Sequence, residues 1–226
     1  MQTILTRARP LIAFTALNTV LRKLDKRAES ILDIGCGKGD PIRFINRNHR
    51  YYCIGVDIFL PYLKKDRENK IHDDYVLCDV RFLPFKKKSF DIALCMEVLE
   101  HLERNDGYQL IIDLEEVACK QVVMTTPIAE YKQSVYDKNP YQEHKWLWLP
   151  VELEYFGYGV RGAGIRKISG DEGLASRVPK ILKPLKELIW VMTGFLTYYQ
   201  PLIAGHMICY KMLGSNKIKI ISALSL

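Results

Sequence analysis

The residues whose types and spacing most directly suggest chemistry are three glycines at alternate positions of the run I-L-D-I-G-C-G-K-G-D, namely Gly35, Gly37 and Gly39. The apolar run 30–34 before them predicts a buried strand, and the glycines predict a tight turn that brings bare backbone close to a ligand. A helix predicted over 41–47 would point its free N–H groups at the same turn. The chemistry that suits this arrangement is cofactor binding, and a plain structural turn is the alternative.

The glycine spacing also counts against one class of cofactor. Dinucleotide-binding proteins carry G-x-G-x-x-G, and here the third glycine comes one residue early. The spacing therefore disfavours nicotinamide and flavin cofactors.

Three aspartates stand near the ends of predicted strands. Asp33 lies in the first run, Asp57 follows the run 52–56, and Asp79 follows the shorter run 75–77. Ligands of open α/β sheets lie outside the carboxyl ends of the strands, so the three carboxylates would converge on one crevice. There Asp57 can accept both hydroxyls of a ribose. The alternative is that each aspartate only caps the helix that follows it.

The rest of the chain alternates helical patterns with short apolar runs. Apolar residues at helical spacing predict an amphipathic helix before the first strand, namely Leu17, Val20, Leu21 and Leu24. Downstream the pattern predicts, in chain order, a helix over 107–119, a strand over 121–126, a helix over 150–156 and strands over 158–161 and 206–213. This alternation indicates an α/β fold with a mainly parallel sheet.

Length and cysteine usage fit a single domain in a reducing compartment. The chain has 226 residues, of which 48% are hydrophobic, enough to bury a substantial core. The cysteines form no C-x-x-C pair and mostly lie in apolar segments: Cys36, Cys53, Cys78, Cys95, Cys119 and Cys209. We therefore expect one domain over 1–226, reduced core thiols, a cytoplasmic location and no metal site.

The basic character of the chain is local. From Arg161 onward, ten lysines and arginines face three acids, a surplus that equals the formal net charge of +7 for the whole chain. We expect a basic and apolar helical insert over 165–205, followed by the last strand and a tail over 214–226. Residues 178–203 either lie on an anionic membrane surface or form a helix that only covers the core. The uninterrupted apolar stretch is too short to cross a bilayer.

Two short stretches of the chain, I-L-D-I-G-C-G-K-G and G-V-D-I, precede a longer one that runs from Cys78 to Leu102. The first two are similar to the first and second motifs of the class I S-adenosylmethionine-dependent methyltransferases. C-D-V-R-F-L-P-F-K-K-K-S-F-D-I-A-L-C-M-E-V-L-E-H-L is similar to the stretch that covers the third and fourth strands. The resemblance is clear over 30–126 and looser to about 164. It implies a doubly wound, Rossmann-like, seven-stranded sheet that is mostly parallel, has an antiparallel last strand beside the fifth, and carries helices on both faces.

The resemblance also implies which residues bind S-adenosylmethionine. The expected set is Asp33, Gly35, Cys36, Gly37, Gly39, Asp57, Ile58, Asp79, Val80, Cys95 and Met96. Within this set, Asp33 and the glycine turn would hold the methionine end and Asp57 the ribose hydroxyls. Asp79 and the backbone of Val80 would meet the adenine, and the last two residues would line the wall beside the sulfonium. A carboxylate near this cationic ligand is favourable in a partly desolvated crevice.

Methyl transfer needs little from side chains, because the sulfonium already activates the methyl group. The acceptor atom must mainly be held close, aligned and partly dry. If a general base is used, the catalytic candidates are His144 and His101, with Glu97 as a further one, since each falls in a segment expected at the crevice. For His101 the alternative is a packed residue. His144 belongs to a loop over 136–148 that we expect to cover the acceptor site.

The predicted function is transfer of a methyl group to an oxygen or nitrogen of a small-molecule, glycan or lipid-linked acceptor. The alternative is a protein that binds the cofactor without catalysis and serves as a scaffold or partner subunit. A nucleic-acid methylase is disfavoured, because the chain has no zinc-finger spacing and T-T-P-I at 125–128 does not resemble N-P-P-Y. Peripheral membrane contact through 178–203 would suit a lipid-linked acceptor.

Overall fold

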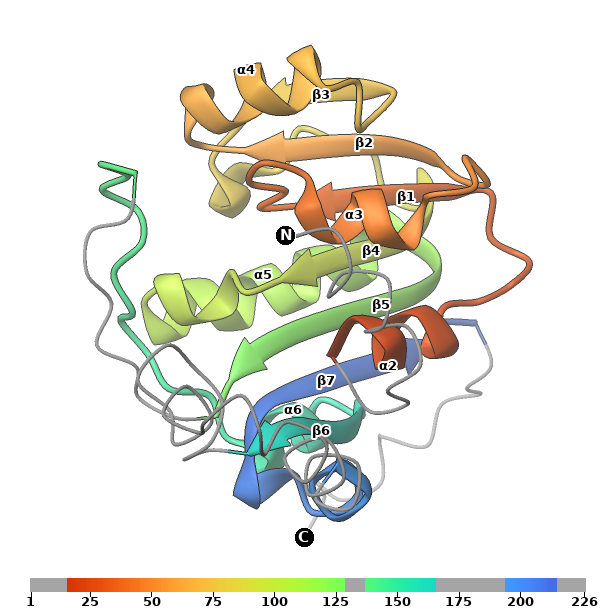
Figure 1. The fold of residues 1–226 in the computed structure, drawn as a ribbon. Coiled ribbons are helices and arrows are strands. Elements are labelled where there is room, and N and C mark those ends of the chain that lie inside the picture. The colour runs from red at the N-terminus through yellow and green to blue at the C-terminus, as the bar shows by residue number, and fades with distance from the viewer. Residues whose placement is uncertain (1–15, 129–136, 166–193, 215–226) are drawn as a thin grey trace, which may run out of the picture.

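The computed structural model describes residues 16–128, 137–165 and 194–214. Seven strands form one sheet in the order β3-β2-β1-β4-β5-β7-β6 (Figure 1). Their bounds are β1 (Ser30–Ile34), β2 (Tyr52–Asp57), β3 (Asp74–Leu77), β4 (Phe90–Met96), β5 (Ala118–Pro127), β6 (Gly159–Ile165) and β7 (Ala204–Met212).

Strand direction places the expected ligand site at the middle of the sheet. Strands β1 to β5 pair in parallel, and β7 pairs antiparallel with both β5 and β6. The strand order reverses at β1, which lies between β2 and β4, and ligands of such sheets bind at this point beyond the carboxyl ends. The predicted sheet, with its antiparallel last strand beside the fifth, is confirmed.

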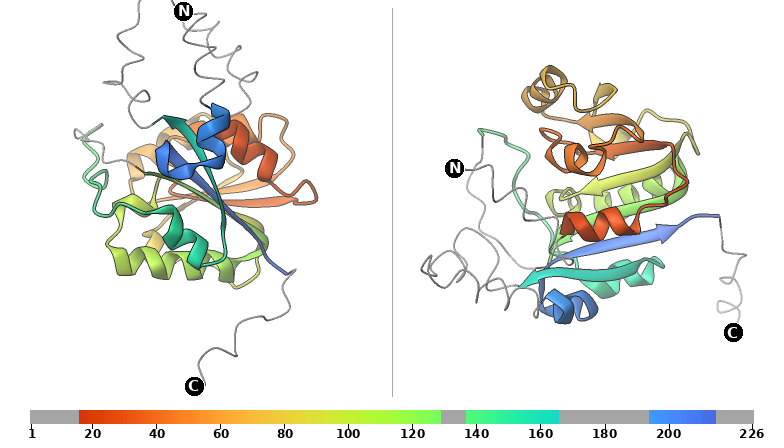
Figure 2. Two further views of the ribbon diagram at one scale, coloured as in Figure 1. Left: turned by 90° about the horizontal axis from the view of Figure 1, so that it is seen from below. Right: turned by 45° about the vertical axis from the view of Figure 1, so that its right-hand side comes forward.

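Helices cover both faces of the sheet, as predicted. The helices are α2 (Ala16–Lys23), α3 (Asp40–Ile45), α4 (Leu60–Glu68), α5 (Arg104–Val117) and α6 (Pro150–Tyr155), with short 3-10 helices η2 (Val80–Phe82), η3 (Leu99–His101) and η6 (Pro201–Ile203). Residues 194–199 are also helical. Figure 2 shows α2 and this last helix on one face and α5 and α6 on the other.

The core consists of two apolar layers separated by the sheet. Alternate residues of β1 point to opposite faces, so Leu32 and Ile34 join the layer under α5, whereas Ile31 joins the layer under α2. Both layers are nearly closed to solvent, with Leu114 and Val20 as fully buried members. Burial on both faces explains why the strand reads as a continuous apolar run.

Several element bounds differ from the predicted ones. Helix α5 begins at Arg104, not at residue 107, and β5 begins at Ala118 because that residue already pairs with Phe90 of β4. The edge pair is longer than predicted, because Ile165 of β6 pairs with Ala204 of β7. Of the expected insert over 165–205, residues 166–193 lie outside the described part of the chain.

Residues 137–149 cross the carboxyl edge of the sheet without regular structure and are held there by main-chain contacts. The amides of Lys145 and Trp146 both donate to the carbonyl oxygen of Glu100, at 2.7 and 3.2 Å. The indole of Trp148 is fully buried and donates to the carbonyl oxygen of Leu99 at 3.0 Å. We call this segment the crossing loop.

Gly107 makes room for the buried indole. A Cβ atom on this residue would lie 2.4 Å from Cζ2 of Trp148, although the residue sits inside α5. Glycine is ordinarily unfavourable in a helix, so its presence here is explained by the close approach of the ring.

We expect Gly107→Ala to destabilise the protein. Alanine in an ordinary helix interior would add roughly 0.5–1 kcal/mol of stability, but displacement of the Trp148 ring should reverse the sign and cost about 1–3 kcal/mol. Urea denaturation measures the change, with Asn105→Ala at an exposed position of α5 as the control, expected within about 0.5 kcal/mol of wild type. A Gly107→Ala protein as stable as wild type would contradict this account.

Candidate functional site

The glycine turn between β1 and α3 has the predicted backbone. Gly35, Gly37 and Gly39 have φ values of 69°, 57° and 78°, in the left-handed region that glycine adopts without strain. The amide of Cys36 donates to the carbonyl of Val56 at 2.9 Å, which ties the turn to β2. The three positions are therefore glycine for a backbone reason.

The turn is packed at its two ends and open at its centre. A Cβ on Gly35 would lie 2.2 Å from Cγ2 of Val98, and one on Gly39 would lie 2.8 Å from Oδ2 of Asp66. A Cβ on Gly37 would meet nothing within 4 Å. Backbone at the centre of the turn is thus accessible to a ligand at the switch point of the sheet.

Asp57 borders this open backbone. Its Oδ2 accepts the amide of Gly37 at 2.8 Å and its Oδ1 accepts the amide of Phe59 at 2.7 Å. Burial raises the pKa of this carboxyl above its usual value, against the lowering effect of the two amides. Each carboxylate oxygen still has a second lone pair, so Asp57 can accept further hydrogen bonds from a ligand. The neighbouring Ile58 is partly buried.

Asp79 lies at the next strand end and already has a charged partner. Its carboxylate accepts hydrogen bonds from both Nε and Nη2 of Arg81, at 3.0 and 2.6 Å, and it also caps η2 through the Arg81 amide. The hydrogen bond from the Arg81 side chain lowers the pKa of Asp79. Val80, which follows it, is buried. A ligand at this position would share the carboxylate with Arg81.

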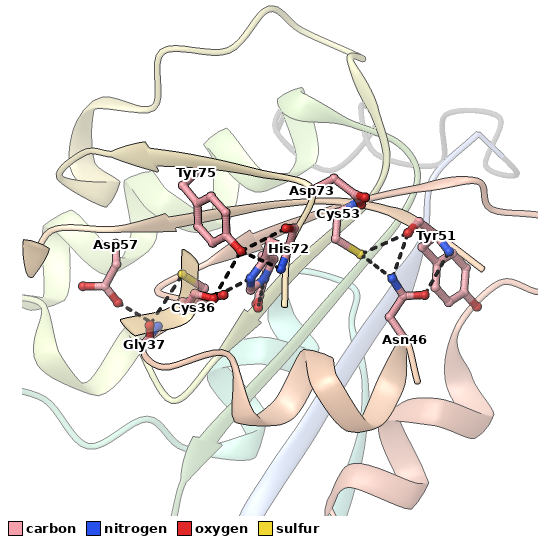
Figure 3. A network of polar contacts seen from close by, with 11 residues as sticks. Cys36, Gly37, Asn46, Tyr51, Cys53, Asp57, His72, Asp73 and Tyr75 are labelled. Atoms are coloured by element: carbon pink, nitrogen blue, oxygen red, sulfur yellow. Dashed lines mark hydrogen bonds and ion pairs between the residues drawn. The ribbon is translucent and has the colours of Figure 1, made fainter. Parts of the chain in front are cut away.

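Asp33 points into a buried network below the turn. Its Oδ2 lies 3.0 Å from Nε2 of His72, and Oδ2 of Asp66 lies 2.8 Å from Nδ1 of the same ring. Asp33 is only 2% exposed. Figure 3 shows His72 between Cys36 and Cys53, with Gly37 and Asp57 on the outer side of Cys36. The Asp33 carboxylate already contacts His72 in this network. Its expected contact with the methionine end of the cofactor stays a prediction.

Three other expected cofactor residues differ in how far they reach the crevice. Burial, with the neighbouring carboxylates, raises the pKa of the Cys36 thiol, which lies under the turn and stays protonated. Cys95 is fully buried in the layer under α5, and its expected contact with the cofactor stays a prediction. Met96 is partly exposed where β4 ends. All six cysteines lie in the described part of the chain and are free.

The two predicted histidines meet on the other side of β4. His101 ends η3 and His144 belongs to the crossing loop, and their rings are in edge contact with centroids 4.9 Å apart. Burial lowers the pKa of both imidazoles. Both rings are therefore neutral at pH 7, the state that can accept a proton or bind a cation.

His206 joins this group and was not predicted. Because β7 inserts beside β5, its residue His206 pairs with Pro127 at the carboxyl edge, where its Nε2 lies 3.3 Å from Oε2 of Glu97. Burial lowers the pKa of His206, but the hydrogen bond and charge of Glu97 outweigh it and the pKa is raised. The sequence did contain a signal for this position, because the strand predicted over 206–213 begins at this residue and was expected to run antiparallel beside the fifth strand.

Two glutamates frame the histidines. Glu97 takes a φ of 55°, uncommon for a residue with a side chain, and its Oε1 accepts the hydroxyl of Thr125 at 2.7 Å. Glu100 is 2% exposed, and its Oε2 accepts the hydroxyl of Thr126 at 3.0 Å. Burial raises the pKa of Glu100 well above its usual value, with the charge of Glu97 adding to the effect. The carboxyl edge thus carries an open glycine turn on one side of β4 and a cluster of acids and imidazoles on the other.

Comparison with known proteins agrees with this geometry. Residues 32–123 match a family described as a methyltransferase domain, a range that runs from β1 into β5 and contains the glycine turn, Asp57 and Asp79. The uncharacterized protein MJ0638 of Methanocaldococcus jannaschii is 33% identical over 146 residues, which are 64% of this chain and 60% of that relative. The chain therefore spans less than two thirds of that relative's length.

Solved structures share the fold over most of the chain. The complex of the Haloferax volcanii methyltransferase activator Trm112 with a candidate methyltransferase matches with a TM-score of 0.59 and 15% identity, over 94% of each chain. An S-adenosylmethionine-dependent methyltransferase from Archaeoglobus fulgidus matches with a TM-score of 0.56 and 19% identity, over 92% of this chain and 93% of that one. Residues 32–123 therefore resemble a methyltransferase domain, and the chain shares its fold with these solved structures.

Proposed function

We propose that this chain binds S-adenosylmethionine and transfers its methyl group to an oxygen or nitrogen of a small-molecule, glycan or lipid-linked acceptor. The observation that carries the proposal is the open backbone at Gly37 beside the carboxylate of Asp57. A nucleoside can approach that backbone closely, because no side chain occupies the space, and the ribose hydroxyls can donate to the carboxylate.

The residues around the turn fit the rest of the cofactor. Asp79 and the backbone of Val80 lie at the next strand end, where the adenine is expected, and Met96 lies partly exposed at the end of β4. When bound, S-adenosylmethionine supplies a methyl group that its sulfonium activates. The chain has to hold the acceptor in line with that group and keep the site partly dry.

The crossing loop connects the two halves of the site. Near its start, Asp137 accepts hydrogen bonds from the side chains of Lys38, in the glycine turn, and Tyr62, in α4. Near its end, His144 contacts His101. The loop therefore runs from the proposed cofactor site to the acid and imidazole cluster, and this supports the expectation that it covers the acceptor.

Exposed apolar side chains support a lipid-linked acceptor as one of the proposed classes. Beside β6 and β7, the segment 194–203 exposes Phe195, Leu196, Tyr199, Leu202 and Ile203, with Leu202 at 64% and Phe195 at 59%. Residues 178–193 of the proposed membrane-contact region lie outside the described chain. Among the helices that the structure describes, none has the length and apolar character needed to cross a bilayer.

The second candidate function is cofactor binding without catalysis, as a scaffold or partner subunit. The Haloferax neighbour is a complex with an activator protein, which supports a search for a protein partner of this chain. Methyl-labelled S-adenosylmethionine incubated with the protein and a cell extract separates the two candidates. The enzyme should place label in an extractable product, whereas binding without transfer would favour the scaffold.

We expect Asp57→Asn to weaken cofactor binding without unfolding the protein. The variant keeps the shape of the side chain but removes the charge that strengthens hydrogen bonds from the ribose, worth roughly 1.5–3 kcal/mol or about 10–100-fold in affinity. Isothermal titration with S-adenosylmethionine measures the change. Asp74→Asn, at an exposed acid that starts β3, is the matched control and should bind like wild type. Equal affinity of wild type and Asp57→Asn would contradict the assignment.

The His72 network should make folding stability depend on pH. Burial lowers the pKa of His72, but the hydrogen bonds and charges of Asp33 and Asp66 outweigh it and raise the pKa to about 9. A raised pKa in the folded state stabilises the protein below the unfolded pKa of about 6.5, and this contribution is lost as pH rises towards about 9.

Urea denaturation of wild type and His72→Gln at pH 6 and pH 9.5 tests this dependence. The stability advantage of wild type should shrink by up to about 3 kcal/mol between the two pH values. His49→Asn, which removes an exposed histidine from the loop before β2, should track wild type. A constant difference between wild type and His72→Gln would show that His72 is not a cation in the folded protein.

A further inference from the structure

Three side chains at the carboxyl end of β4 converge on one point. Glu100 and His101 come from η3 and His144 comes from the crossing loop, and their potential ligand atoms all lie within 4.8 Å of one another. The group consists of two imidazoles and one carboxylate. This donor set recurs in proteins that bind divalent first-row transition metals and leave coordination positions open.

Backbone contacts orient the first imidazole towards the carboxylate. Nδ1 of His101 lies 3.0 Å from the carbonyl oxygen of Glu143, and a carbonyl only accepts, so Nδ1 carries the hydrogen. The lone pair of the neutral ring is then on Nε2, which lies 4.0 Å from Oε1 of Glu100. These two atoms are too far apart for a hydrogen bond.

The other two side chains also have atoms that are free to bind an ion. Nε2 of His144 is shielded from solvent and has no hydrogen-bond partner among the described residues. Glu100 is held through its second oxygen, because Oε2 accepts the hydroxyl of Thr126 at 3.0 Å. Outer partners that fix an imidazole or a carboxylate in this way are a regular feature of metal sites.

We propose that Glu100, His101 and His144 bind a divalent first-row transition-metal ion on the acceptor side of the site. Ligands at about 2.1 Å from one ion lie about 3.4 Å apart in a tetrahedral arrangement, so the widest separation in the cluster has to shorten by up to about 1.4 Å. The ion would occupy the point on which the three side chains converge. This inference rests on the proposed function and deepens it.

The proposed ion favours a hydroxyl acceptor. With three protein ligands the coordination shell stays open, and an acceptor oxygen that entered it would lose its proton more readily. The crossing loop supplies His144, so the segment that covers the acceptor would also complete the ion site.

A second buried cluster does not share these properties. Cys36, Asp66 and His72 also lie close together, but both ring nitrogens of His72 already face carboxylates, at 3.0 and 2.8 Å. All three residues are buried beneath the glycine turn. They are therefore better explained as support for the turn.

Mn²⁺ is the probe for the proposed site, because its electron paramagnetic resonance signal reports free and bound ion separately. Chelator-treated wild-type protein should bind one equivalent, and Zn²⁺ should displace it. Glu100→Gln, which keeps the bond to Thr126, and His144→Asn should each weaken binding by more than about 100-fold. His49→Asn should bind like wild type. Absence of saturable Mn²⁺ binding to wild type, or equal binding by the variants, would overturn the proposal.

Cofactor binding keeps this proposal separate from the proposed function. Asp57→Asn should lose affinity for S-adenosylmethionine and keep Mn²⁺, whereas Glu100→Gln should do the reverse. Wild type that binds the cofactor but no Mn²⁺ would remove the ion site alone. If the variants fold poorly, Mn²⁺ added to wild type should broaden the imidazole resonances of His101 and His144 and spare His49, and equal broadening of all three would contradict the site.

Discussion

The charged contact between His72 and two buried carboxylates is the constraint on which the glycine turn depends. Asp33 comes from β1 and Asp66 from α4, and without a cation between them their charges would repel each other in a medium of low dielectric. Asp66 also touches the position where Gly39 would carry a side chain. The imidazole therefore joins a strand, a helix and the turn at one point, and the open backbone at Gly37 keeps its shape because its surroundings cannot move independently.

The rest of the site follows from where the strands end. The reversal of strand order at β1 places Asp57 and the turn on one side of β4, and the 3-10 helix η3 places Glu100 and His101 on the other. The two halves have different chemistry because their burial and partners differ. The turn offers backbone and a carboxylate that amides hold in place, whereas the η3 side offers neutral imidazoles beside an acid that burial disfavours as an anion.

The sequence predicted the parts of the site that local pattern determines. Glycine spacing and the aspartate after β2 place the turn and Asp57, because both depend on residues within one strand and its exit. Asp33 shows the limit, since its position was predicted but its partner His72 comes from a loop across β2, and no local pattern specifies that contact. His206 was missed for a similar reason, because its approach to Glu97 depends on how β7 inserts into the sheet. The predicted helix started at Gly107, whereas α5 begins at Arg104. Gly107 lies inside the helix because the Trp148 ring packs against it.

Attachment of the end of the crossing loop, residues 145–148, through main-chain oxygens has an evolutionary consequence. Every residue type has a carbonyl, so substitutions at Leu99 or Glu100 leave the hydrogen bonds to Trp148 and Lys145 available. Solvent-facing residues of the same segment, such as Tyr141 and Glu143, take no part in that attachment through their side chains. Descendants of this protein could thus exchange one acceptor for another by altering those outward groups, while the frame that delivers His144 is inherited intact.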